Sequence, residues 1–120
     1  MKAEELMIGD WVKISHLNKI GKVYRIDRAN GEGNGFAAVI DGDYYEGNLE
    51  PIPLTTEILE KNGFSSNYAE DDLSYAESCG DIIGIHIYGK NGLMDEMYFK
   101  YVHQLQQALR LCGIEKEIVL

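Results

Sequence analysis

The hydrophobic pattern of the chain changes at the segment that contains Pro51 and Pro53. Before this segment, apolar and polar residues alternate over short runs separated by glycine, asparagine and aspartate, which is typical of strands joined by turns. After it, a capped stretch and a later apolar stripe with a period of about 3.6 residues indicate helices. Each proline pushes its predecessor away from the helical region, so the segment itself is extended. We therefore predict an α+β protein whose first part consists of strands.

The first part, residues 1–52, holds four predicted strands and one extended segment, at residues 11–14, 21–26, 35–40, 44–46 and 49–53. Asp41-Gly42-Asp43 provides a tight turn between the third and fourth strands. Short strands at such close spacing cannot bury both faces as an open sheet. We therefore expect them to curl into a small β-barrel.

The second part, residues 53–120, is predicted to be a β-hairpin packed with one or two helices. A first helix begins at Thr55 or Thr56 and ends at Gly63, and a second runs from Tyr101 to Cys112. The second helix is expected to bury Val102, Leu105, Ala108, Leu109 and Cys112 and to expose His103, Gln106, Gln107 and Arg110. Predicted strands are 73–77, 82–88 and 93–99, with an edge strand at 114–120. We expect both parts to share a core, as one compact domain or nearly so, because each alone is small for a stable core.

Charge and cysteine content limit the classes of function. The net charge is −9, which repels polyphosphate and anionic membranes at long range and weighs against a general nucleic-acid binder. No run of apolar residues is long enough for a signal peptide or a membrane span, so we expect a cytoplasmic protein without membrane contact. Cys79 and Cys112 are too far apart for a CxxC site and too few for a disulfide framework.

The sequence contains no motif of a catalytic, metal or cofactor site. His16, His86 and His103 have no second ligand at a suitable spacing on the same element, so we predict no metal. No nucleophile motif is present, and Cys79 has no base partner in its own segment. The glycine-rich residues 31–35 lead into a strand rather than a helix, unlike a phosphate-binding loop. We accordingly predict a protein that is not an enzyme and needs no cofactor.

Two local concentrations of charge stand out as candidate surfaces. The first is basic, interleaved with aromatic residues, and consists of Trp11, Lys13, Lys19, Lys22, Tyr24, Arg25 and Arg28. Such a surface can contact phosphates and stack on bases, although a solvated strand face is the interpretation that the overall charge favours. The second is acidic and consists of Glu70, Asp71 and Asp72, which we interpret as a solvated loop because no glycine and distal glutamate complete a calcium loop.

Two stretches in the first part carry a family resemblance. The segments 8–14 (Ile-Gly-Asp-Trp-Val-Lys-Ile) and 21–26 (Gly-Lys-Val-Tyr-Arg-Ile) resemble the hairpin that opens SH3-like barrels, including the KOW domains of transcription and translation factors. This resemblance implies that the predicted barrel is SH3-like. It also implies that the basic residues between Lys13 and Arg28 form a binding surface.

A second resemblance extends over most of the chain. Residues 3–12, residues 49–64 with Pro-Ile-Pro-Leu-Thr, and residues 101–107 with Tyr-Val-His-Gln-Leu-Gln are similar to a family of small uncharacterised proteins. Members of that family occur in gut-dwelling anaerobic bacteria, their phages and their mobile elements. The chain departs from the family pattern after Leu111, and the resemblance implies relatives without implying an activity.

Three functional hypotheses follow from the sequence. The leading one is a non-enzymatic module, of phage or mobile-element type, that binds another protein. The second is nucleic-acid binding through residues 13–28. The third is an acidic mimic of DNA that occupies the basic groove of a host defence protein.

Overall fold

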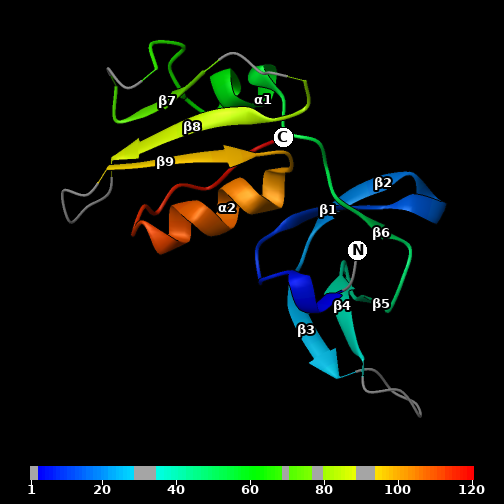
Figure 1. The fold of residues 1–120 in the computed structure, drawn as a ribbon. Coiled ribbons are helices and arrows are strands. Elements are labelled where there is room, and N and C mark those ends of the chain that lie inside the picture. The colour runs from blue at the N-terminus through cyan, green and yellow to red at the C-terminus, as the bar shows by residue number, and fades with distance from the viewer. Residues whose placement is uncertain (1–2, 29–34, 69–70, 77–79, 89–93) are drawn as a thin grey trace. The chain divides into compact units, whose positions relative to one another are not determined.

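The computed structural model describes residues 3–28, 35–68, 71–76, 80–88 and 94–120. The chain divides into two compact units, Met1–Ile52 and Pro53–Leu120. Figure 1 shows strands in both units and the two α-helices in the second. Nine strands form three small antiparallel sheets in the described residues, which confirms the α+β class. No closed barrel forms among them.

The first unit contains two three-stranded sheets. In one, β1 (Trp11–Ile14) pairs with β2 (Lys19–Lys22) and β6 (Leu49–Glu50). In the other, β4 (Phe36–Ile40) pairs with β3 (Arg25–Arg28) and β5 (Asp43–Tyr45). Each central strand is the one whose residues are most buried, because neighbours cover it on both edges.

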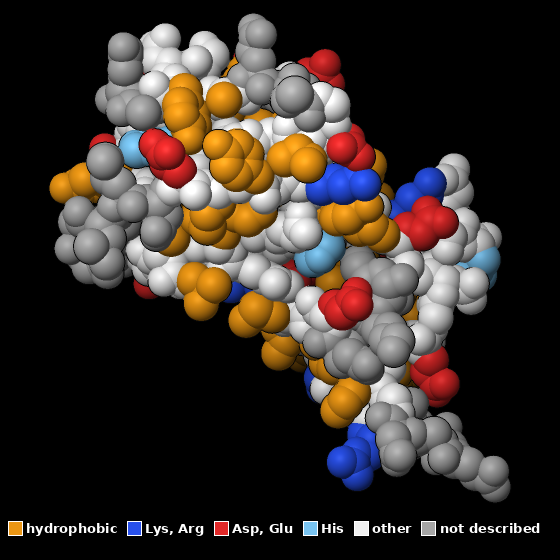
Figure 2. Space-filling model, in the orientation of Figure 1, with side chains coloured by type: hydrophobic (Ala, Val, Ile, Leu, Met, Phe, Trp, Pro, Cys, Tyr) orange, Lys and Arg blue, Asp and Glu red, His pale blue; other side chains and the backbone are white. Residues whose placement is uncertain are grey.

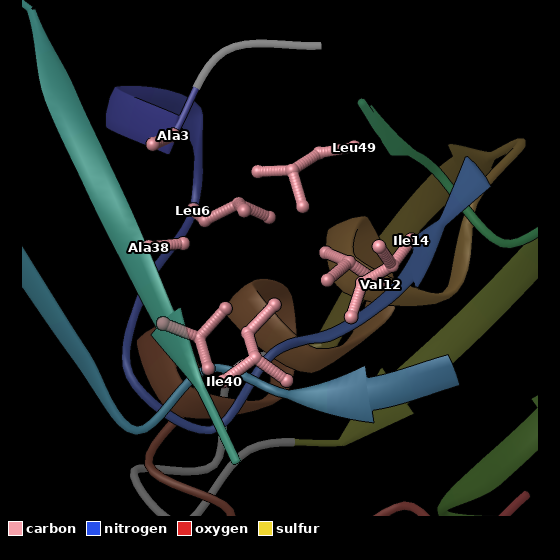
Figure 3. Packing of buried hydrophobic residues seen from close by; sticks show 8 residues of the cluster. Ala3, Leu6, Val12, Ile14, Ala38, Ile40 and Leu49 are labelled. Carbon is pink, nitrogen blue, oxygen red and sulfur yellow. The ribbon is translucent and has the colours of Figure 1, made fainter. Parts of the chain in front are cut away.

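One hydrophobic cluster joins the two sheets of the first unit. It consists of Ala3, Leu6, Val12, Ile14, Val23, Ala38, Ile40 and Leu49. Figure 3 shows side chains of β1 and β4 directed into this common interior, with Leu6 and Leu49 between them. The pattern follows from alternation, since every second residue of a strand points to the same face. The two small sheets therefore share one core, although neither closes on itself.

The chain passes from the first sheet to the second at Val23 and Tyr24. The Val23 N–H donates to the Asp10 carbonyl at 2.9 Å, and the Gly9 N–H donates to the Val23 carbonyl at 2.7 Å. The Tyr24 N–H then donates to the Val39 carbonyl of β4 at 2.8 Å. The prediction of a single strand over 21–26 was therefore wrong, because the hydrogen-bond partner changes within it.

Gly21 lies where a side chain would meet the opposite sheet. A Cβ atom built on Gly21 would stand 2.5 Å from Cγ2 of Ile40, whose side chain is completely buried. We expect Gly21→Ala to lower the free energy of unfolding by about 1–3 kcal/mol, because the overpacked core must shift. Urea denaturation followed by Trp11 fluorescence would measure this change.

Gly47→Ala is the matched control, since nothing lies within 4 Å of a Cβ at Gly47. Equal stability of the Gly21 and Gly47 variants would contradict the close approach of the two sheets at Gly21.

The second unit begins with the helix α1 (Thr56–Lys61). The Thr55 side chain accepts a hydrogen bond from the Ile58 N–H at 3.2 Å, which caps the first turn. Gly63 ends the helix with a positive φ of 83°, and the Phe64 N–H bonds back to the Leu59 carbonyl. The predicted helix, its Thr cap and its glycine stop are confirmed.

The sheet of the second unit has the order β7 (Leu73–Tyr75), β8 (Ile83–Tyr88) and β9 (Met94–Phe99). Its inner face carries the buried side chains of Tyr75, Ile83, Ile85 and Ile87. The predicted strands are confirmed with slightly different ends, and the turn expected at 89–92 lies outside the described residues. The helix α2 (Val102–Leu111) runs along β9 (Figure 1).

The predicted polar side of α2 is only partly correct. His103 and Gln106 are buried at 9% and 6% exposure, whereas Arg110 is exposed. Gln104, in the first turn of the helix, caps its start: the side-chain oxygen accepts hydrogen bonds from the N–H groups of Lys100 and Tyr101, each at 3.0 Å. Packing within the second unit therefore buries polar residues of this helix in addition to its apolar stripe.

The last residues form no strand, contrary to the prediction of an edge strand at 114–120. The side chain of Asn62 replaces a strand partner there: its amide oxygen accepts from the Val119 N–H and its amide nitrogen donates to the Val119 carbonyl, both at 2.8 Å. The same nitrogen donates to the Ile58 carbonyl at the end of α1. Ile118, next to this contact, is almost completely buried. An amide side chain thus binds the last segment as another peptide group would.

We expect Asn62→Ala to destabilise the protein by about 1–3 kcal/mol, because buried backbone groups lose their partners. Amide hydrogen exchange should show faster exchange at Val119, with little change at Ile85 in the middle of β8. Lys61→Ala is a suitable control, since its ammonium makes an exposed bond to the Leu120 carbonyl. Unchanged exchange at Val119 in the Asn62 variant would rule out the proposed role of this amide.

Candidate binding groove

An open groove of about 630 Å³ lies on the surface of the first unit. It is lined by Ile8, Gly9, Lys22, Val23, Tyr24, Arg25, Val39, Asp41, Gly42 and Tyr44. The volume is in the range of about 300–1,000 Å³ found for ligand pockets. Ile8, Tyr24 and Tyr44 are 65%, 72% and 57% exposed, so the groove offers large apolar groups to solvent. Exposed apolar side chains gathered in one place are a common feature of interaction sites.

The groove follows from the register of the second sheet. Val39 is paired with Arg25 on one side and with Tyr44 on the other, so these three residues share one face. Val39 itself is 4% exposed because the longer side chains of its neighbours cover it. Tyr24 lies where the chain passes from one sheet to the other, and its N–H donates a hydrogen bond to the Val39 carbonyl. Its side chain also lines the groove.

The guanidinium of Arg25 is fixed by two partners. Its Nε atom lies 2.8 Å and 2.9 Å from the two carboxylate oxygens of Asp27, and one terminal nitrogen donates to the Tyr44 hydroxyl at 3.1 Å. The hydrogen bond and charge of Asp27 raise the pKa of Arg25 further above its ordinary value. These contacts hold the Tyr44 ring in place and offset the charge of Arg25.

Trp11 and Lys22 meet at one side of the groove. They are directly paired across β1 and β2, and the ammonium of Lys22 lies 5.0 Å from the centroid of the Trp11 ring. This distance is that of a cation–π contact. Lys13 lies on the same strand as Trp11 and is paired with Ile20 and Glu50.

The remaining basic residues do not join this group. Lys19 forms an ion pair with Asp41 at 2.9 Å, and this hydrogen bond and charge raise the pKa of Lys19. Arg28 stands at the far end of β3, opposite Phe36. Of the predicted basic surface, the structure places Lys22, Tyr24 and Arg25 in the groove lining, with Trp11 in contact with Lys22. Lys13, Lys19 and Arg28 lie outside the lining.

Sequence reasoning missed, among other groove residues, the large side chains of Ile8, Val39 and Tyr44. Tyr44 follows a tight turn and belongs to the fourth predicted strand, so the alternation along that strand is the signal that could have identified it as a surface residue. Ile8 precedes the first strand and has no such signal.

Asp71 and Asp72 are exposed, while Glu70 lies outside the described residues. Cys79 also lies outside the described residues. Within the described ranges, no three His, Cys, Asp or Glu side chains are grouped so that they could hold a metal ion. In the same part of the chain, no helix is long and apolar enough to cross a membrane.

Comparisons with protein-family models, curated proteins and solved structures found no match for this chain. The groove is therefore interpreted from its own chemistry.

Trp11 is the single tryptophan of the chain and reports directly on its contact with Lys22. We expect Lys22→Met to weaken quenching of Trp11 fluorescence by iodide and to strengthen quenching by caesium, because the variant loses a positive charge beside the ring. Lys19→Met serves as the control, since Asp41 already offsets the Lys19 charge. Iodide quenching that is the same in wild type and Lys22→Met would contradict the contact.

Proposed function

We propose that the first unit is a non-enzymatic binding module that takes an extended, mainly apolar segment of a partner protein into the groove beside Tyr24 and Tyr44. The observation that carries this proposal is the exposure of Ile8, Tyr24 and Tyr44 around one open hollow. Exposed aromatic side chains are typical anchors of protein interfaces, since they contribute large contact areas at little conformational cost.

The geometry of the groove supports a rigid site. Tyr44 is tied to Arg25, and Arg25 is tied to Asp27, so both side chains are ordered before a partner arrives. A preorganised site loses less conformational entropy on binding and therefore binds more tightly. The backbone at Gly9 and Gly42 lines the groove without side chains and leaves room for a second main chain.

Nucleic-acid binding through residues 13–28 is the alternative that the charges support less well. Arg25 and Lys19 already have carboxylate partners, and the whole chain carries a net charge of −9. Phosphate binding draws its affinity from unpaired cations that release counterions, and these pairs reduce that gain. Binding of an apolar protein segment, by contrast, does not depend on unpaired cations on the surface of the first unit.

Two finer assignments belong to the same proposal. We regard the first unit as related to SH3-like barrels, with the two sheets around one core as the supporting feature. We also keep the predicted kinship with small proteins of gut bacteria and their phages or mobile elements, on the sequence blocks described above. Under that kinship, the partner is a protein of the same cytoplasm.

The test is a selection of peptides from a random library on the immobilised protein. The enriched peptides should bind Tyr24→Ala at least about tenfold more weakly than wild type, a loss of about 1.4 kcal/mol that is typical of an aromatic anchor. Isothermal titration calorimetry of the synthetic peptides provides the affinities.

Tyr98→Ala is a matched control, because Tyr98 in the second unit is as exposed as Tyr24, at 72%. Peptides that lose equal affinity for both variants, or a library that yields no enriched peptide, would count against the groove. Salt-sensitive binding of single-stranded oligonucleotides that depends on Lys22 would favour the nucleic-acid alternative instead.

A further inference from the structure

The face of the second unit's sheet opposite Ile83, Ile85 and Ile87 carries an unusual set of side chains. Ser74 of β7, His86 of β8 and Glu96 of β9 are directly paired across the three strands, so they lie in one row on that face. Gly84 and Tyr98 form the next row. In Figure 2, hydrophobic, acidic and histidine side chains lie next to one another over the region of β8 and β9.

Three tyrosines gather on this face. Tyr98 is 72% exposed and lies over Gly84, because a Cβ built on Gly84 would stand 3.3 Å from Cε1 of the Tyr98 ring. Tyr88 is 44% exposed, at the end of β8. The ring of Tyr68 meets the His86 ring edge-on, with centroids 6.0 Å apart. Burial raises the pKa of Tyr68, and the nearby Glu96 and Tyr98 raise it further. This effect agrees with the location of Tyr68, Glu96 and Tyr98 on one face of the sheet.

Negative charge surrounds these rings. Glu96 is exposed in the middle of the face, and the Asp72 carbonyl accepts a hydrogen bond from the Tyr88 N–H at 2.9 Å, which places Asp72 and its exposed neighbour Asp71 beside Tyr88. The three strands contain no Lys or Arg residue. Lys100, which follows β9, is paired with Asp81 at 2.9 Å. The face is therefore anionic and aromatic.

His86 provides an independent indication of a ligand rich in hydrogen-bond donors. Its side chain is 2% exposed, and within the described residues its Nδ1 atom has no hydrogen-bond partner. In the tautomer that carries its proton on Nε2, this nitrogen accepts a hydrogen bond. A buried polar atom without a partner is rare and calls for an explanation.

We propose that this face binds an arginine-containing segment of a partner protein. A guanidinium stacks on tyrosine rings and pairs with a carboxylate in the same plane, which fits Tyr98 and Glu96 side by side. The His86 imidazole, paired with Glu96 across the strands, lies beneath this pair as an acceptor without a partner in the described residues. The acidic residues Asp71 and Asp72 attract the same segment at longer range.

The experiment titrates the full chain with a short peptide of alternating arginine and glycine, followed by NMR shifts of the β8 and β9 amides. Tyr98→Ala should weaken binding about fivefold, as the loss of one cation–π contact predicts, whereas Tyr98→Phe should bind as wild type. Glu96→Gln should weaken binding more than Glu50→Gln, which removes the same charge from an exposed position on β6 in the first unit.

If Glu96→Gln and Glu50→Gln lost equal binding affinity, the net charge of the chain alone would explain the loss. That result would overturn the proposal. Unchanged affinity in Tyr98→Ala would overturn it as well. A matched peptide of alternating lysine and glycine that binds as tightly as the arginine peptide would also overturn it, because a cation without a planar guanidinium would then suffice. Amide shifts confined to β8 and β9, with none at the Tyr24 groove, would support a second surface independent of the first unit's function.

Discussion

The arrangement of the first unit depends on the absence of a side chain at Gly21. With a side chain at this position, β2 would collide with Ile40, and the core shared by the two sheets would have to shift. The crossing at Val23 and Tyr24 follows directly from that approach, since the backbone of Val23 bonds to one side and the N–H of Tyr24 to β4. The position of Tyr24 at the groove is therefore a consequence of core packing three residues earlier in the chain, at Gly21.

In the second unit, a different constraint has a similar effect. The end of α1 must present Asn62 with its amide directed at Val119, and the glycine stop at Gly63 fixes where the helix ends. A helix one residue longer or shorter would rotate this amide away from the last segment, because successive helical residues differ by about 100° in direction. The Thr55 cap and the Gly63 stop thus determine a contact with residues far along the chain.

The features predicted correctly from the sequence are those set by neighbouring residues. Alternation over Ile83, Ile85 and Ile87 and the caps at Thr55 and Gly63 are local signals, and they produced correct elements. The change of partner at Val23, the replacement of a strand by Asn62 and the burial of His103 depend on residues distant in sequence, for which no local pattern exists. The α+β class was therefore predictable, but the closed barrel and the last strand were not safe inferences.

The same distinction applies to the candidate surfaces. The run from Lys13 to Arg28 appears as one basic stretch in the sequence, yet folding distributes it over two sheets. Carboxylates at Asp27 and Asp41 then offset two of its charges.

On the second unit, the residues that matter are spread over three strands, so no single stretch of sequence reveals their proximity. Antiparallel pairing places Ser74, His86 and Glu96 in one row, and alternation puts this row on the face opposite the isoleucines, where Glu96 is exposed. The chain thus presents a charge-balanced aromatic groove on one unit and an anionic aromatic face on the other. Because those surfaces differ in charge, the two proposals assign them partner segments of different composition, apolar for the groove and basic for the sheet face.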